Sequence, residues 1–332
     1  ACLKTLVDAG AKVDATNNIG YSALIAAAGN GHKECVQILL DAKADVDAAS
    51  HSKDTALILS AWQGHTACLQ QLLDAKADVS VKNQYDDTAS TLAARGGRAA
   101  CLRLLLTAKA DVDAVSQSGY TAAMLAAREG HADCLQLLID LEADINAETL
   151  QNDNALILAA SQGHTACLQL LLEAKSSINN PNQDGDNALM FAARHGHLAC
   201  LEMLLDAKAD IEAKNKNDET ALIAAALYGR TECAHLLLQA KANINAANKD
   251  GATALFGAAR QGQNACLQML VDAKADANSS DEDHNTALIL AANRGTACAQ
   301  MLLDAKADVN ARNKNGDTAL ILAALNNNSA CL

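Results

Sequence analysis

The sequence has few aromatic residues and almost no proline. Of its 332 residues, 2% are Phe, Trp or Tyr and only one is proline, whereas 50% are hydrophobic. A core without large rings has to be built from Ala, Leu, Ile and Cys side chains, which favours thin, even layers over packing around large anchors. The length alone would fit two ordinary globular domains, and this composition argues against them.

Basic residues and long apolar runs are also scarce. The chain has 26 Lys and Arg against 39 Asp and Glu, a net charge of −13, and its isoelectric point is near 5.0. This balance argues against nucleic-acid binding, which needs clustered basic groups to displace counterions. No uninterrupted apolar run approaches the roughly 18 residues of a membrane span, so we expect no direct membrane insertion. The first residues already read as a helix, so we also expect no signal peptide.

Cysteine is abundant but regularly spaced. Every step between neighbouring cysteines is 33 residues except one of 32: Cys2, Cys35, Cys68, Cys101, Cys134, Cys167, Cys200, Cys233, Cys266, Cys298 and Cys331. Stacked helices lie roughly 8–10 Å apart, too far for the Cα separation of a disulfide. We therefore predict buried structural thiols, and a reducing intracellular or cytoplasmic compartment. A metal ladder or a redox relay is the alternative.

One stretch, Thr55–Asp78, is the unit from which the chain is made. An apolar segment, Ala56–Ala61, stops at Gly64-His65, and a second segment, Cys68–Ala75, carries its apolar residues on one helix face. Two short helices around a glycine turn are predicted, followed by a polar run. The residue that starts each first helix recurs every 33 residues, and after 32 in the last step: Ser22, Thr55, Thr88, Thr121, Asn154, Asn187, Thr220, Thr253, Thr286 and Thr318.

This register divides the chain into nine full repeats and two partial ones. The full repeats are 17–49, 50–82, 83–115, 116–148, 149–181, 182–214, 215–247, 248–280 and 281–312, and the partial ones are 1–16 and 313–332. The ninth repeat lacks one residue in the turn that leads from Gly295 to Cys298. Because both ends fall inside a repeat, we expect a fragment of a longer array.

The period and its motifs resemble the ankyrin repeat. The family's Thr-Pro-Leu-His stands here as Thr-Ala-Leu-Ile, for example at Thr55–Ile58, and its Gly-Ala-Asp as Lys-Ala-Asp, for example at Lys76–Asp78. The resemblance covers essentially the whole chain. It implies an all-α ankyrin-repeat solenoid, 1–332, of stacked helix-turn-helix units with hairpin-like tips between them.

Two sets of positions are expected to need a left-handed backbone. At the end of each second helix the family has glycine, which survives here only as Gly10 and is otherwise replaced by Lys or by Glu142. The tips carry Gly, Asn or Asp where a positive φ is expected, and Lys53 and His284 depart from this rule.

The sequence shows no catalytic machinery. It has no glycine-rich phosphate loop, no nucleophile elbow and no Ser-His-Asp set that the repeat would bring together. Five histidines (His32, His65, His131, His164 and His197) occupy the turn of the repeat, where pairing with the neighbouring backbone explains them. The run Asp281–His284 fits a solvated charge run better than a cation site. We therefore expect no enzyme, no cofactor and no metal.

The residues that vary within the constant frame indicate function. By the resemblance, ankyrin arrays bind partners on a concave face made from the tips and the first helices, and Trp, Tyr and Arg are enriched at interface hot spots. We predict that this face contributes Trp62, Tyr85, Arg95, Tyr120, Arg128, Arg194, Leu227, Tyr228 and Arg260.

Two structural roles for these residues stay open as alternatives. Tyr120, like Tyr21, fits equally well as an ordinary framework choice just before the helix start. The arginines could pair with acids at the base of the tips: Asp54, Asp87, Asp153, Asp186 and Glu219.

The sequence thus predicts a non-enzymatic scaffold that binds one or more protein partners, including as a subunit of a larger assembly. The alternative is a regulatory or tethering segment of a larger enzyme or membrane channel.

Overall fold

A computed structural model describes residues 2–292 and 296–325. These residues form helices joined by turns and contain no strand, only isolated bridges at the tips. The helices are α1 (Cys2–Asp8), α2 (Ala23–Gly29), α3 (Lys33–Asp41), α4 (Ala56–Gln63), α5 (Thr66–Asp74), α6 (Ala89–Arg95), α7 (Ala99–Thr107), α8 (Ala122–Glu129), α9 (Ala132–Asp140), α10 (Ala155–Gln162), α11 (Thr165–Glu173), α12 (Ala188–His195), α13 (Leu198–Asp206), α14 (Ala221–Leu227), α15 (Thr231–Gln239), α16 (Ala254–Gln261), α17 (Asn264–Asp272), α18 (Ala287–Ala291), α19 (Thr296–Asp304) and α20 (Ala319–Leu325). The prediction of an all-α repeat fold is confirmed.

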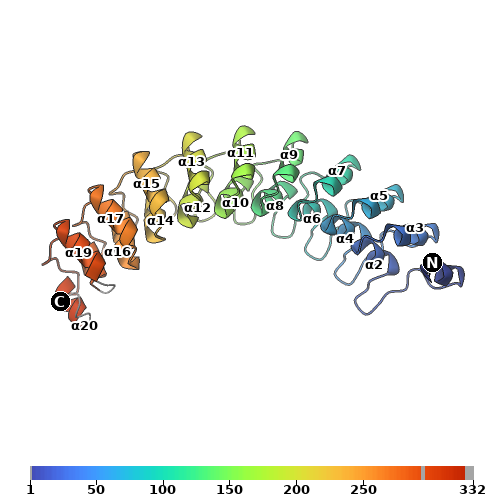
Figure 1. Ribbon diagram of the computed structural model, residues 1–332, viewed down its shortest axis with the longest axis horizontal. Helices are drawn as coiled ribbons and strands as arrows, with labels where there is room; N and C mark the ends of the chain where they lie inside the picture. Colours follow the sequence, from blue (N-terminus) through green and yellow to red (C-terminus); the bar gives the residue numbers. More distant parts are fainter. Residues whose placement is uncertain (1, 293–295, 326–332) are drawn as a thin grey trace. The chain divides into compact units, whose positions relative to one another are not determined.

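The chain divides into two compact units, Ala1–Ala159 with Ala166–Ser176, and Ala160–Thr165 with Ser177–Leu332. In the first unit the first helices α2, α4, α6 and α8 lie side by side, with α3, α5, α7 and α9 beside them as a second layer (Figure 1). The second unit repeats this arrangement with α12, α14, α16 and α18 in one layer and α13, α15, α17 and α19 in the other. Each unit is therefore a two-layered stack of helical hairpins.

The residue that starts each first helix acts as its N-cap. Thr55 Oγ1 accepts a hydrogen bond of 3.3 Å from the backbone N–H of Ile58, and Asn154 Oδ1 accepts one of 2.9 Å from Ile157. Such caps satisfy one of the donors that a helix leaves unpaired at its N-terminus. The same bond forms at Ser22 and at Thr318, so the predicted starts are correct along the described chain.

The helix ends adopt the left-handed backbone that the sequence predicts. Lys76 has φ +70° and Glu142 has φ +59°, although neither is glycine. The two departures at the tips, Lys53 with φ +61° and His284 with φ +59°, adopt it as well. Since this conformation costs an ordinary residue roughly 1–2 kcal/mol, the surrounding turn has to hold it in place.

The turn between the two helices connects neighbouring repeats. A Cβ on Gly97, whose φ is +68°, would lie 2.6 Å from Nδ1 of His131 in the next repeat. The other ring nitrogen of His131, Nε2, lies 3.1 Å from the carbonyl oxygen of Arg95, and His197 contacts the carbonyl of Ser161 in the same way. The predicted pairing of turn histidines with neighbouring backbone is thus confirmed at these two positions.

A second connection joins the exits of successive repeats. The backbone N–H of Asp45 donates a 2.9 Å hydrogen bond to the carboxylate of Asp14, and Asn243 donates one of 2.6 Å to Glu212. Similar bonds recur in both units with Asp or Asn as the acceptor. At these junctions one repeat therefore supplies a side-chain acceptor for the backbone of the next.

The cysteines line the inner side of the second helices. Those from Cys68 to Cys298 are buried, and all described cysteines are free thiols. Two cysteines depart from the predicted buried row: Cys2 is exposed and Cys35 is half-buried. Cys2 lies on α1, whose main helix contact is with α3 alone, so neighbouring helices do not close around it. Cys331 lies outside the described residues, as does part of the shortened turn at Gly295.

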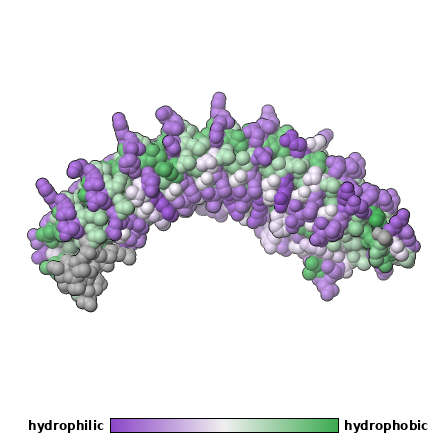
Figure 2. Space-filling model, in the orientation of Figure 1, coloured by the Kyte–Doolittle hydropathy of each residue, from purple (hydrophilic) through white to green (hydrophobic). Residues whose placement is uncertain are grey.

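The surface of both units is predominantly polar on the face shown in Figure 2, where apolar side chains lie in small separate areas between hydrophilic ones. Exposed large apolar residues include Trp62, Tyr85 and Tyr228 at 48%, 59% and 49% exposure. Single exposed apolar side chains are normal on a protein surface, so exposure by itself does not identify a binding site. Whether these residues form a binding site depends on the side chains around them.

Candidate functional site

Two positions of the repeat face each other on the side of the tips, as contacts in both units show. The first, here called the tip-base position, directly precedes the N-cap, and the second, the helix-end position, lies eight residues later at the end of the first helix. The ring of Tyr120 lies 5.2 Å from the guanidinium carbon of Arg128, and Asp186 binds Arg194 through two hydrogen bonds of 2.7 and 3.0 Å. Two helical turns bring these side chains together, which the sequence shows only as a spacing.

In the first unit this arrangement produces a pocket of about 290 Å³. It is lined by residues of two neighbouring repeats and is here called the Arg95 pocket; its walls include Tyr85, Asp87, Arg95, Ser116, Tyr120 and Arg128. Four of the nine residues predicted to bind a partner therefore meet around one hollow. Tyr85 and Arg95 are exposed, whereas Tyr120 and Arg128 are half-buried.

Asp87 provides a buried carboxylate in this pocket. The residue is only 8% exposed, and burial raises the pKa of its carboxyl group; the nearby Arg95 opposes this effect, while Asp54 and Asp86 add to it. In the described part of the chain, no ion pair joins Asp87 to Arg95. Arg128, in contrast, lies 3.2 Å from the carboxylate of Glu129 as well as over the ring of Tyr120. Arg95 is thus the more available of the two guanidinium groups.

Trp62 occupies the helix-end position of the preceding repeat. Its side chain is about half exposed, while its backbone is fixed, because its carbonyl oxygen accepts a 3.2 Å hydrogen bond from Nε of Arg98. An exposed indole on a fixed backbone is suited to contact a partner at low conformational cost.

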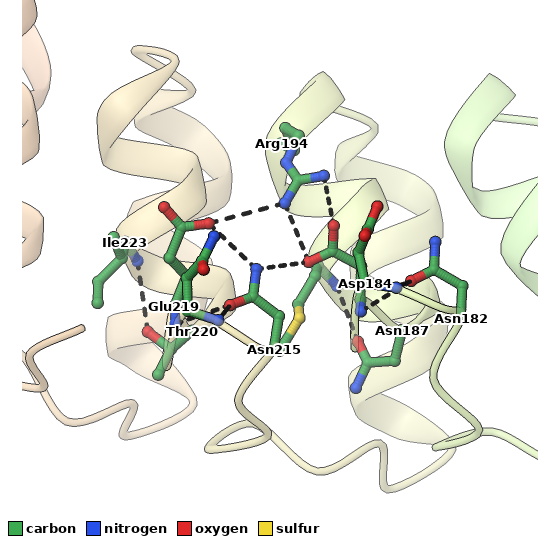
Figure 3. A network of polar contacts seen from close by, with 11 residues as sticks. Asn182, Asp184, Asn187, Arg194, Asn215, Glu219, Thr220 and Ile223 are labelled. Atoms are coloured by element: carbon green, nitrogen blue, oxygen red, sulfur yellow. Dashed lines mark hydrogen bonds and ion pairs between the residues drawn. The ribbon is translucent and has the colours of Figure 1, made fainter. Parts of the chain in front are cut away.

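Arg194 lies at the helix-end position in the second unit and is held by acids (Figure 3). Its guanidinium bonds both carboxylate oxygens of Asp186 and lies 4.0 Å from Glu219, and the side-chain amide of Asn215 bridges the two acids with bonds of 2.8 and 3.1 Å. Burial lowers the pKa of Arg194, but the hydrogen bonds and charge of Asp186, with Tyr228 and Glu219, outweigh it, so the pKa is raised. For Arg194, the expected alternative of pairing with tip-base acids is what the structure contains.

The remaining predicted residues lie in the second unit. Leu227 packs against Gly257 of the next repeat, where an added Cβ would lie 3.5 Å from the Leu227 Cα atom, and Tyr228 is about half exposed. Arg260 lines another pocket, of about 410 Å³, together with Asp250, Asp281 and Asp283. These residues are not brought to the Arg95 pocket.

The histidine, cysteine and acidic side chains of the described residues are distributed along the repeats. Among them, no group of three or more His, Cys, Asp or Glu side chains is placed to hold a metal ion. No helix in the described part of the chain has the length and apolar character needed to span a bilayer. Burial also raises the pKa of the Cys134 and Cys167 thiols to about 11, which makes them poor nucleophiles.

Sequence reasoning missed the part that Asp87 and Ser116 play. The sequence indicates Asp87 only as an acid that could pair with an arginine, and it gives no sign that Ser116 lines a pocket. The sequence signal for this pocket is the spacing of eight residues between Asp87 and Arg95, read together with Ser116 and Tyr120 of the following repeat.

Comparisons with known proteins agree with the repeat architecture. A family model described as ankyrin repeats (3 copies) matches residues 1–83, 68–149, 145–215, 207–281 and 257–332. The crystal structure of the human ASB11 ankyrin repeat domain is similar, with a TM-score of 0.63 and 25% sequence identity over 67% of this chain and 99% of that chain. Comparison with curated protein sequences gives no match.

Proposed function

We propose, from the premise that this chain belongs to the ankyrin repeat family, that it is a non-enzymatic scaffold that binds a protein partner through the tip side of its first unit. Ankyrin repeats are generally protein–protein interaction modules. The observation that carries the proposal is the Arg95 pocket, where Tyr85, Arg95, Tyr120 and Arg128 meet.

The chemistry of this surface suits a protein partner. Interfaces depend on a few aromatic and Arg anchors that are desolvated on binding, and their surroundings mainly exclude water. Tyr85 and Trp62 are each about half exposed. The following repeat holds the backbone of both, because Gln117 N–H donates to the Tyr85 carbonyl at 2.9 Å and Arg98 Nε donates to the Trp62 carbonyl at 3.2 Å. These rings therefore supply contact area with little loss of side-chain freedom.

In the second unit, Arg194, Leu227, Tyr228 and Arg260 stay secondary candidates. The free thiols fit a reducing intracellular compartment, which we include in the proposal together with a place as a subunit of a larger assembly.

The experiment is affinity capture followed by titration. The wild-type chain and the Trp62→Ala and Tyr85→Ala variants are used as bait, and the captured protein is then purified and titrated against each. We expect each substitution to weaken binding by roughly 2 kcal/mol while the melting temperature changes little. Gln70→Ala is the control, since Gln70 lies on the opposite layer and bonds only Asp74 at 2.8 Å. Equal capture by all four chains would contradict the proposal.

A further inference from the structure

The same pair of residue types, Asp at the tip-base position and Arg at the helix-end position, occurs in both units; it is ion-paired in the second unit and not in the first. In the second unit the guanidinium of Arg194 is held between the carboxylates of Asp186 and Glu219, and Asn215 bridges the acids (Figure 3). Arg194 is consequently only 19% exposed at its side chain. Each charged group of this network has a partner within the chain.

Asp87 and Arg95 occupy the equivalent positions three repeats earlier. Asp87 is at the tip base and Arg95 eight residues later, as Asp186 and Arg194 are. The two residues that complete the network are replaced, however. Ser116 stands where the second unit has Asn215, and Tyr120 stands where it has Glu219. The set of residues around Arg95 thus lacks the second carboxylate and the bridging amide.

The consequences of this loss are visible in the Arg95 pocket. Arg95 is exposed, and in the described residues it makes no ion pair, whereas Asp87 is buried and accepts no hydrogen bond on its carboxylate there. Burying a charged group without a partner is costly. The pocket therefore holds an acid and a guanidinium that line the same hollow but are not joined. The charge of Arg95 only partly opposes the rise that burial causes in the pKa of Asp87.

We propose that the Arg95 pocket binds the carboxylate of an Asp or Glu side chain of the partner, which supplies to Arg95 the second carboxylate that Glu219 supplies to Arg194. The inference rests on the proposed function and adds the chemistry of the partner segment. The lining of the pocket carries two guanidinium groups, Arg95 and Arg128, and one carboxylate, Asp87. Arg128 is paired with Glu129, so Arg95 is the cation left to bind a further carboxylate. Charge complementarity therefore favours an acidic segment.

Binding completes the network that the chain leaves open. With a partner carboxylate in place, Arg95 lies between two acids, Asp87 on the inner side and the partner on the outer side, as Arg194 lies between Asp186 and Glu219. A guanidinium suits this bridge, because its planar fork can bond two carboxylates at once. The exposed ring of Tyr85 covers the aliphatic part of the entering side chain.

The test uses short random peptides displayed on phage and selected on the wild-type chain. The selected peptides are synthesised with a fluorophore, and their affinity is measured by anisotropy beside versions in which each Glu is replaced by Gln and each Asp by Asn. We expect acidic residues to be enriched, and the amide versions to bind roughly tenfold or more weakly. Arg95→Gln in the protein should cause a similar loss.

Tyr120→Glu provides the decisive variant. It supplies within the chain the carboxylate that Glu219 supplies in the second unit, so it should occupy Arg95 and reduce binding of acidic peptides roughly tenfold or more without lowering the melting temperature. Tyr120→Gln is its control, because it removes the ring without adding the charge. If Tyr120→Gln weakens the binding of acidic peptides as much as Tyr120→Glu does, the inference is overturned.

The remaining outcomes separate this inference from the proposed function. Peptides that bind the wild type, lose affinity with Trp62→Ala or Tyr85→Ala, but bind equally as acid and amide would overturn the carboxylate site and leave the proposed function standing. Enrichment of basic peptides would have the same meaning. Peptides that bind all variants equally, or the absence of any selected peptide, would contradict both.

Discussion

The ring nitrogen Nε2 of His131 lies 3.1 Å from the carbonyl oxygen of Arg95, so the turn of one repeat is bonded to the end of the first helix in the repeat before it. Arg98 and Arg230 occupy the same turn position in other repeats, and their Nε atoms bond the carbonyls of Trp62 and Arg194 at 3.2 and 3.1 Å. The helix-end position, where most of the predicted binding residues lie, is therefore fixed by the following repeat.

This relationship predicts the effect of replacing His131. His131→Ala removes the bond to Arg95 and should lower the free energy of unfolding by about 1 kcal/mol. His131→Arg should be nearly neutral, because arginine forms the equivalent bond at positions 98 and 230. Urea denaturation followed by circular dichroism measures both. An equal loss in the two variants would show that packing against Gly97, rather than the hydrogen bond, determines the contribution.

Glycine should stabilise the chain at Lys76. Lys76 has φ +70°, a conformation that costs an ordinary residue roughly 1–2 kcal/mol. Lys76→Gly removes this strain but adds roughly 0.5–1 kcal/mol of unfolded-chain entropy, so we expect a net gain of about 0.5 kcal/mol. The neighbouring Ala75, with φ −78°, is the control. Ala75→Gly should destabilise, and a gain from both would contradict the role of strain.

Removal of a buried hydroxyl should also stabilise the chain. Ser90 is 1% exposed, and its Oγ has no hydrogen-bond partner among the described residues. It occupies the slot that holds Leu57 in the preceding repeat. Ser90→Ala should therefore raise the free energy of unfolding by about 1 kcal/mol.

Ser60 provides the matched control for Ser90. It is equally buried, but its hydroxyl donates a 3.0 Å bond to the carbonyl of Leu57. Ser60→Ala should lower stability or leave it unchanged. Thermal melts of both variants test the pair, and a loss for Ser90→Ala would mean that the hydroxyl has a partner.

Replacement of Arg194, which is ion-paired, should destabilise the chain more than replacement of Arg95, which is not. Arg194→Ala leaves Asp186 buried beside Glu219 without its cation, and we expect a loss of about 3 kcal/mol. Arg95→Ala should cost less than about 0.5 kcal/mol, since Arg95 forms no ion pair in the described residues. Chemical denaturation of both variants measures the difference. Equal losses would indicate that Arg95 pairs with Asp87 in solution.

The buried thiols should make stability fall at high pH. Burial raises the pKa of five of them from 9.0 to about 11: Cys134, Cys167, Cys200, Cys233 and Cys266. Above about pH 9 the unfolded chain loses these protons first, so it binds fewer protons than the folded chain, and the free energy of unfolding decreases toward pH 11. Below about pH 8 the thiols are protonated in both states and contribute no pH dependence.

The measurement is a series of urea titrations in the presence of a reductant from neutral pH to about pH 10. A variant in which these five cysteines are replaced by alanine is the control, because its other titrating groups are unchanged. Its stability should fall less steeply above pH 9 than that of the wild type. Parallel curves for the two chains would show that the thiols do not ionise on unfolding in this range.

The sequence predicted the repeat and its backbone well, because both depend on local chemistry. Thr55 marks a helix start since its hydroxyl caps the helix, and Lys76 marks a helix end since the turn requires a positive φ whichever residue stands there. The outer cysteines were less predictable: Cys2 has a sequence neighbourhood similar to that of Cys134, and the helices around it decide its burial.

The sequence indicates the residue types of the candidate site and allows pairing of its arginines with tip-base acids, but it does not show which arginine is paired. Arg95, Arg128 and Arg194 share one position in the repeat, and nothing in that position distinguishes them. Their difference depends on residues of the following repeat, Ser116 and Tyr120 for Arg95, which come close only when two hairpins stack. Sequence reasoning by single positions could not show that Arg194 is bound to acids while Arg95 is not.

The bonds between repeat exits have an evolutionary consequence. In each of them one repeat offers a side-chain oxygen and the next offers a backbone N–H, which every residue except proline has. If residues 215–247 were lost, Glu212 would meet the N–H of Asp276 in place of that of Asn243, and the junction would be of the same kind as before. Whole repeats can therefore be deleted or duplicated in one step, so the length of the array can change in evolution while each junction stays the same.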